Sequence, residues 1–394
     1  MLRAAAFCFL FCLSAFSFAQ TSSHTIASST PSSGVQVIYV VDGSTLTTYN
    51  VDPQTLQATA VGTLTLPEST YPDVVTSTNG RFLYYSAYLS SSQQDHELYV
   101  YDTNASGVPG QNPVQQLKAT HLSGLVVHPS GKFLYRISVG PTSAQFTTPY
   151  DIVRDLINPK NGKLSAPITE ATYTLDSNVS GNDCSLAILG FNVVGTEMYD
   201  GIFCYGPHAS ATITYNQRSV DPQTGALGPD QEVYSYSSYA ASEYASVQFE
   251  ANLMFAFVSY YNQGPNANLV DVYQLPNVTT PQINCTTSML AVCGDFIFGL
   301  AHPSGKYVFL TDPTNVTDIG AVNLSTQQIT ETSSIPYEVQ QFSPDGTIAY
   351  AVNDVNGALD IEIYGFNVDT GDVRQGGTIS VPSDLDSWFS AERY

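Results

Sequence analysis

The sequence has few positively charged residues: 12 Lys and Arg stand against 34 Asp and Glu, for a formal net charge of −22 at pH 7. A surface this acidic repels phosphate backbones and anionic lipid headgroups. We therefore expect no nucleic acid and no membrane surface as partners. Charged residues make up only 12% of the chain, and Ser, Thr, Asn, Gln and Tyr fill the other polar positions. This composition is typical of a β-rich extracellular protein.

Familiar catalytic and cofactor motifs are also missing. The chain has no nucleophile elbow, zinc-binding helix, phosphate loop or dinucleotide fingerprint. A single Trp, with no recognisable set of cofactor-binding Lys or Arg, argues against a quinone-dependent dehydrogenase. No Cys-x-x-Cys or His cluster suggests a metal centre. We therefore expect neither a cofactor nor a metal.

Beyond residue 19 no stretch is long and apolar enough to cross a bilayer. The first 19 residues form a basic start, a short apolar run from Ala4 to Phe18 and a small residue, Ala19, before Gln20. That order is typical of a signal peptide cleaved near Ala19. The sequence thus predicts a signal peptide over 1–19, a flexible Ser/Thr-rich leader over 20–34, and a secreted or periplasmic protein.

Cysteine is scarce, with six residues, two of them inside the apolar N-terminal run. The other four are Cys184, Cys204, Cys285 and Cys293. Cys184 and Cys204 are equally distant from Val194, so a hairpin turning there places them opposite each other, close enough to bridge. Cys285 and Cys293 could close a short loop. Because export permits disulfides, we expect disulfides in preference to a metal site.

What the sequence does contain is a repeated hairpin signature. Each copy has an apolar run, a tight turn built on Pro, Asn, Asp or Ser with Gly, and a second run rich in aromatic and β-branched residues. The clearest copies are Ser77–Tyr84, His128–Tyr135, Ala301–Phe309 and Phe342–Tyr350. Gly supplies the positive φ that such a turn requires. Recurrence every 40 to 65 residues or so, without helical periodicity, indicates a β-propeller.

A second turn also recurs, at Val51–Thr55 and, almost letter for letter, at Val220–Gly225. Looser copies are Ile157–Gly162 and Val368–Gly371. Each repeat therefore has four strands: an inner strand, an aromatic second strand, a third ending in this turn, and a fourth.

Counting first hairpins gives the number of blades. Their turns fall near Gly80, Gly131, Gly195, Asn252, Gly305 and Gly346. The C-terminal segment 381–394 resembles a seventh first strand that stops at its turn, whereas residues 35–66 form a repeat without a first strand. The sequence therefore predicts an all-β chain: one seven-bladed propeller of four-stranded antiparallel blades over 35–394. The C-terminal strand closes the ring by pairing with the N-terminal blade, which leaves only short edges.

Together, the Pro-Ser-Gly-Lys-Phe-Leu-Tyr and Ser-Pro-Asp-Gly hairpins, the Val-Asp-Pro-Gln-Thr-Gly turns and the seven repeats resemble the lactonase-type seven-bladed propellers. These are the 6-phosphogluconolactonase-like and muconate-cyclase-like proteins. The resemblance covers about residues 35–394 and lies in turns rather than catalytic groups. It implies a funnel at the start of the inner strands, where a His and carboxylates act as acid and base and arginines hold an anion.

Counting back in register from the hairpin turns gives the residues at the starts of the inner strands. The candidate catalytic residues are His121, Asp295 and Glu338, and the candidate binding residues are Asp73, Glu243 and Asp386. Lactone chemistry needs a group whose pKa lies near neutrality, and His is the natural choice. The alternative interpretation is that these are ordinary solvated loop residues. A phosphorylated or carboxylated lactone needs cationic residues to bind it. This chain has few, and several of them, such as Lys132 and Lys306, lie in hairpin turns.

Two functions remain open at this stage. The first is an exported lactonase-like enzyme that hydrolyses or isomerises a small lactone or sugar acid. The second is a non-catalytic secreted propeller that binds a ligand or a protein through its funnel or rim. In either case we expect a monomer.

The register also exposes a charged pair. Five residues after the hairpin Gly, second strands carry apolar or aromatic residues, but two consecutive blades have Arg136 and Asp200 there. An isolated charge buried between blades costs several kcal/mol. We therefore predict that Arg136 and Asp200 form a structural ion pair or a shared hydrogen-bond network between the two blades, in preference to a catalytic role for Arg136.

Overall fold

The structure is a computed structural model that describes residues 35–67, 69, 73–88, 96–119, 122–143, 146–179, 182–192, 194–205, 211–238, 243–250, 253–260, 269–275, 280–286, 296–355, 358–381 and 385–393. These residues form strands β1–β28 joined by turns, with no helix among them. No membrane-spanning helix is therefore found in this part of the chain. The predicted signal peptide and leader, residues 1–34, lie outside it.

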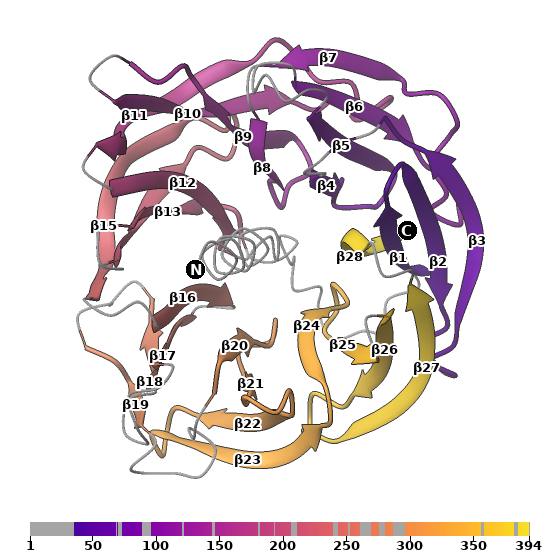
Figure 1. The fold of residues 1–394 in the computed structure, drawn as a ribbon, viewed down its shortest axis with the longest axis vertical. Coiled ribbons are helices and arrows are strands. Elements are labelled where there is room, and N and C mark those ends of the chain that lie inside the picture. The colour runs from indigo at the N-terminus through magenta and orange to yellow at the C-terminus, as the bar shows by residue number, and fades with distance from the viewer. Residues whose placement is uncertain are drawn as a thin grey trace, which may run out of the picture.

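The strands form seven four-stranded antiparallel blades arranged in a ring (Figure 1), as the sequence predicts. Blade 1 contains, from the centre outward, β28 (Leu385–Arg393), β1 (Val35–Asp42), β2 (Thr45–Val51) and β3 (Ala58–Thr65). Blade 2 contains β4 (Asp73–Thr76), β5 (Phe82–Tyr88), β6 (His96–Asp102) and β7 (Gln115–Ala119). Blade 3 contains β8 (Leu122–Val127), β9 (Phe133–Val139), β10 (Thr147–Leu156) and β11 (Ile168–Val179).

The remaining four blades repeat this order. Blade 4 contains β12 (Asn182–Phe191), β13 (Glu197–Tyr205), β14 (Ala211–Val220) and β15 (Leu227–Ser238), and it joins blade 3 through a β11–β12 pairing. Blade 5 contains β16 (Glu243–Glu250), β17 (Leu253–Tyr260), β18 (Leu269–Gln274) and β19 (Ile283–Thr286). Blade 6 contains β20 (Phe298–Ala301), β21 (Tyr307–Thr311), β22 (Thr317–Asn323) and β23 (Gln328–Ile335). Blade 7 contains β24 (Glu338–Phe342), β25 (Ile348–Val355), β26 (Ala358–Phe366) and β27 (Val373–Val381).

The recurring first hairpin has the predicted geometry. In blade 3, the His128 N–H donates to the Phe133 carbonyl over 2.9 Å, and Gly131 at the turn has φ +67°. The same bond closes the turns in blades 2, 4, 6 and 7. Residues with a Cβ atom rarely adopt this φ. Gly131 therefore fixes the turn type and, through it, the register of both strands.

The core lies between the blades rather than inside them. Because strand side chains alternate, each blade presents one apolar face to the previous blade and one to the next. On β9, Leu134 packs against blade 2, whereas Phe133 and Tyr135 pack against blade 4. The apolar clusters of the described residues each join two consecutive blades around the ring.

The C-terminal strand closes the ring, which confirms the predicted pairing. In Figure 1, β28 lies against β1 at the inner edge of blade 1. The two strands pair antiparallel from Val35↔Arg393 to Val41↔Ser387. The first blade thus takes its inner strand from one end of the chain and its other three strands from the opposite end.

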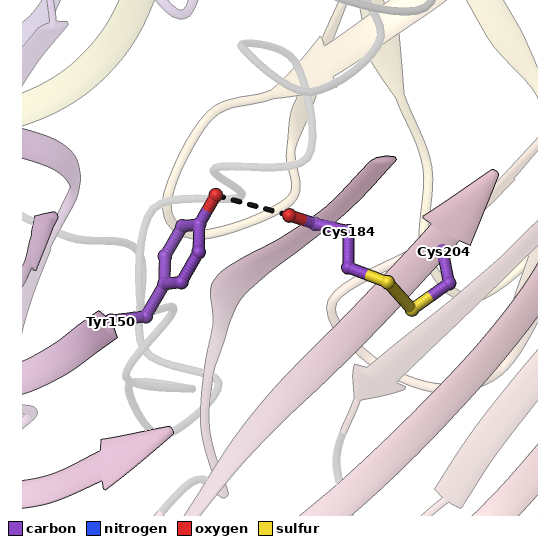
Figure 2. The surroundings of a disulfide bond; sticks show 3 residues. All are labelled: Tyr150, Cys184 and Cys204. Atoms are coloured by element: carbon purple, nitrogen blue, oxygen red, sulfur yellow. Dashed lines mark hydrogen bonds between the residues drawn. A yellow bond between two sulfur atoms is a disulfide. The ribbon is translucent and has the colours of Figure 1, made fainter. Parts of the chain in front are cut away.

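The predicted disulfide between Cys184 and Cys204 is present. The two residues pair directly across β12 and β13, with Cα atoms 4.0 Å apart. Tyr150 on blade 3 donates its hydroxyl to the Cys184 carbonyl over 3.0 Å (Figure 2), so the bridged strand pair is also tied to its neighbour. Cys285 is disulfide-bonded as well, while Cys293, its predicted partner, lies outside the described residues.

The prediction that Arg136 pairs with Asp200 is wrong, although both side chains are buried as expected, at 7% and 0% exposed. Arg136 Nε instead lies 2.8 Å from Asp155 Oδ2 in its own blade, and Asp200 Oδ2 lies 2.9 Å from Arg218 Nε. The physical reason is proximity within the sheet. The partner on the third strand of the same blade is a diagonal cross-strand neighbour, closer than the matching site one blade away.

The two ion pairs occupy equivalent positions with the charges exchanged. Asp200 also accepts hydrogen bonds from Asn216 Nδ2 over 3.0 Å and from the Tyr173 hydroxyl over 2.9 Å. Tyr173 belongs to β11 of blade 3, so it links the two blades. Burial raises the pKa of Asp200, whereas these donors and Arg218 favour its charged form. The buried Asp200 carboxylate is thus hydrogen-bonded to three side chains, those of Tyr173, Asn216 and Arg218.

Glu250, at the end of β16, is the least compensated buried acid of the described residues. It pairs with Leu253 across the blade 5 hairpin, in the place that His128 holds in blade 3. His128 suits that place because its ring remains neutral and its Nε2 lies 2.7 Å from the Gly195 carbonyl of blade 4. A carboxyl there is only 7% exposed, and burial raises the pKa of Glu250 to about 8.

Deleting residues 382–394 should abolish soluble folding, because it removes β28 and leaves the β1 edge unpaired. Soluble yield and size-exclusion chromatography measure the effect. Deleting the predicted leader, residues 20–34, is the control and should leave the melting temperature unchanged. A soluble, monomeric protein lacking β28 that melts like the full chain would show that closure is dispensable.

Replacing Asp200 by Leu should lower the free energy of unfolding by about 3–5 kcal/mol, because it removes the buried counter-charge of Arg218 and leaves only the exposed Asp230, 3.6 Å away. Adding Arg218→Met should recover much of that loss, as measured by urea denaturation. Asp102→Asn is the matched control, because it breaks an exposed pair with Arg81 and should cost less than about 1 kcal/mol. Strictly additive effects of the two buried substitutions would contradict the pairing.

Glu250→Gln should stabilise the protein at neutral pH. The pKa of Glu250 is about 8 in the folded state and 4.5 in the unfolded chain. Below pH 4.5 the carboxyl is protonated in both states, so it does not reduce the free energy of unfolding. Loss then accumulates as the pH rises toward about 8, at roughly 1.4 kcal/mol per pH unit. Melting temperatures between pH 5 and 8 should therefore fall more steeply for the natural protein than for Glu250→Gln. Parallel curves would show that Glu250 ionises freely when folded.

Candidate functional site

The inner strands surround the centre of the ring: β4, β8, β12, β16, β20, β24 and β28 (Figure 1). Because every blade repeats the same antiparallel order, these strands run in one direction and begin at one end of the ring. We call that end the entrance face; the first hairpin turns lie at the opposite end. The predicted site residues were chosen because they fall at the starts of these strands.

The structure places these predicted residues as follows. Asp73, Glu243 and Glu338 are the first residues of β4, β16 and β24, and Asp386 is the second residue of β28. Their backbone positions thus agree with the register. Of these four, only Glu338 has a described side chain. His121 and Asp295 lie outside the described residues, so their proposed catalytic roles stay predictions.

Glu338 is held by a threonine from the neighbouring blade. Thr317, at the start of β22 and fully buried, donates its hydroxyl to the Tyr337 carbonyl over 2.7 Å. The same oxygen accepts the Val339 N–H over 3.1 Å. It also lies 2.8 Å from the Thr311 hydroxyl across the β21–β22 pair. Thr317 therefore fixes the backbone on both sides of Glu338 and sets where its side chain emerges.

Gln340 is hydrogen-bonded to this carboxyl. It lies in a β-bulge, where the β24–β25 register shifts between Val339 and Gln341. Its Nε2 donates to Glu338 Oε1 over 3.3 Å. Its Oε1 is buried and has no hydrogen-bond partner among the described residues. Bulges often re-aim side chains next to active sites, and this one places a buried acceptor without a partner beside a carboxyl.

The electrostatics of Glu338 suit proton transfer. The side chain is half-buried, and desolvation raises the pKa of its carboxyl, an effect only partly offset by the Gln340 hydrogen bond. A carboxylate with a raised pKa is a stronger base than a free one. Glu338 and Gln340 together can take a proton from water or hold a hydroxyl group.

The loop between β21 and β22 contains an acidic residue, Asp312, that acts within its own turn. Asp312 Oδ1 accepts the N–H groups of Thr314 and Val316 over 2.7 and 3.0 Å, which caps its own turn. Turn chemistry therefore accounts for this carboxylate. Among the described residues, no group of three or more His, Cys, Asp or Glu is placed to hold a metal ion.

Sequence reasoning missed Thr317 and Gln340. Nothing in the sequence marks Thr317 as a residue whose hydroxyl bonds across blades. Gln340 owes its position to a bulge, and no glycine or proline in Glu338–Phe342 signals one.

Comparison with known proteins identifies the fold. No family model and no curated protein sequence matches the chain. A Bacteroides uniformis structure named as a candidate 6-phosphogluconolactonase has 14% identity and a TM-score of 0.58, and covers 91% of this chain and 100% of its own. The Pseudomonas aeruginosa periplasmic gluconolactonase (11%, TM-score 0.54) and a Lactobacillus plantarum protein (11%, 0.51) each cover 91% of this chain and 99% of their own. The chain therefore shares its seven-bladed propeller with lactonase-like proteins.

Proposed function

We propose that the protein is a lactonase-like hydrolase that opens a small cyclic ester at the entrance face, with Glu338 as the general base. The observation that carries the proposal is the Glu338–Gln340 pair: a desolvated carboxyl with a raised pKa beside a buried, unused acceptor. The lactonase names of two structural neighbours support the same reaction class.

The chemistry follows from what these groups can do. Ionised Glu338 removes a proton from a water molecule as its oxygen attacks the lactone carbonyl. The tetrahedral intermediate then collapses, the ring C–O bond breaks, and protonated Glu338 returns its proton to the leaving alkoxide. The products balance as one hydroxy acid from one lactone and one water. Gln340 orients the carboxyl through its Nε2 and offers its Oε1 to the water or to a substrate hydroxyl.

A non-catalytic function remains the second candidate. The Gln340 acceptor would also suit a polyhydroxylated ligand that is bound and not transformed. Calorimetry with a lactone and its hydrolysed product separates the two: binding of both without turnover indicates a binding protein.

The site of action is proposed to be outside the cytoplasm. Disulfides such as Cys184–Cys204 persist in oxidising compartments, and one structural neighbour is a periplasmic protein. This agrees with the predicted cleavage near Ala19.

Glu338→Gln should lower kcat for glucono-1,5-lactone about 10²- to 10⁴-fold, the usual contribution of a general base. Because only ionised Glu338 accepts a proton, the natural enzyme should gain activity as the pH rises through its raised pKa, above the ordinary 4.5. Rates are measured between pH 4 and 7, after subtracting spontaneous hydrolysis.

Glu362→Gln is the matched control, because Glu362 is also buried but lies on β26 and bonds Thr378. It should retain full activity. A Glu338→Gln enzyme as active as this control would remove Glu338 from the mechanism. Activity that falls with rising pH would instead make Glu338 the general acid.

A further inference from the structure

The described positively charged side chains all lie away from the inner strands, although Lys118 lies at the entrance end of the outermost strand of blade 2. Three arginines are buried between blades and neutralised there: Arg136 by Asp155, Arg154 by Glu170 and Arg218 by Asp200. Each Nε lies 2.8–2.9 Å from a carboxylate oxygen. Each of these cations is paired within its own blade and cannot leave its partner to bind a substrate without leaving a buried charge unpaired.

The other described cations lie at the opposite end of the ring or on its outer surface. Arg81, Lys132 and Lys306 lie in first hairpin turns, Lys160 and Lys163 lie in the β10–β11 turn, and Lys118 and Arg374 lie on the outermost strands β7 and β27. Arg374 donates to the Gln54 carbonyl of blade 1 over 2.8 Å. Arg393 ends β28, and its backbone pairs with Val35 at the end away from the entrance face. Hence no described Lys or Arg side chain lies on an inner strand.

Acidic residues instead occupy the first positions of several inner strands. Asp73, Glu243, Glu338 and Asp386 stand at the starts of four inner strands. An anionic substrate group bound near these positions would face acidic residues from four blades, and no described Lys or Arg side chain on an inner strand could neutralise it. Repulsion between like charges strengthens as water is excluded. The unused Gln340 Oε1 is, by contrast, an acceptor suited to a neutral hydroxyl group.

From this charge arrangement we propose that the substrate is an uncharged, hydroxyl-rich lactone, neither phosphorylated nor carboxylated. The inference rests on the proposed lactonase function and narrows its substrate class. It also accounts for product release: ring opening turns a neutral molecule into a carboxylate, which the entrance acids repel. The same site thus admits the neutral substrate and disfavours the anionic product.

The test compares glucono-1,5-lactone with 6-phosphoglucono-1,5-lactone, which differ only in the phosphate. The expected result is a kcat/KM at least about 100-fold higher for the neutral lactone, as one strongly unfavourable charge contact implies. Equal or better use of the phosphorylated lactone would overturn the substrate inference and leave the lactonase function standing. Hydrolysis of neither would overturn the lactonase function, and the inference with it.

Charge-neutralising variants give a second, independent reading. Asp73→Asn and Glu243→Gln should each reduce the preference for the neutral lactone several-fold, because each removes one repelling charge. Asp369→Asn is the control, since Asp369 is an exposed acid in the β26–β27 turn, at the end of the ring away from the entrance. Added salt should also narrow the preference by screening. If the ratio of kcat/KM values for the two lactones changes equally in the Asp369→Asn control, or changes in none of the variants, entrance charge does not set specificity.

Discussion

Each blade of this protein is apolar on both faces, and every other feature depends on that constraint. A four-stranded sheet of this kind cannot be stable alone, because it buries its faces only against two neighbours. The apolar clusters accordingly bridge consecutive blades and do not fill them. A ring is the arrangement in which no blade lacks a neighbour, so the pairing of β28 with β1 completes the core as well as the sheet.

Polar groups buried at the blade junctions follow from the same packing. At three successive junctions a second-strand tyrosine donates to the turn carbonyl of the next blade: Tyr39 to Gly107, Tyr84 to Gly162 and Tyr135 to Gly225. A buried carbonyl without a donor is costly, so each hydroxyl fixes the height of one blade against the next. Hydrophobic burial supplies most of the stability here, and these bonds supply alignment.

How much the sequence could predict depends on whether a residue acts locally. The turn at Gly131 fixes its own hairpin, so hairpins, strand order and the opposition of Cys184 and Cys204 could all be read by counting. Counting also located Glu338 at the start of β24 and the buried charges of Arg136 and Asp200. It failed on their partners, because equivalent positions on adjacent blades compete with nearer positions across one sheet.

The site depends on the least predictable of these contacts. Thr317 reaches Tyr337 and Val339 from another blade, and Gln340 emerges from a bulge that shifts the register by one residue. Neither is encoded in a local motif: the Thr317 contacts exist only once two blades are packed, and the bulge exists only once β24 has paired with β25. The same packing that occupies Arg136, Arg154 and Arg218 in buried pairs also leaves those arginines unavailable for binding an anion. In an acidic chain with so few cations, neutralising buried carboxylates and binding a negatively charged substrate are competing uses of the same residues. Here the three buried arginines neutralise carboxylates inside the blades.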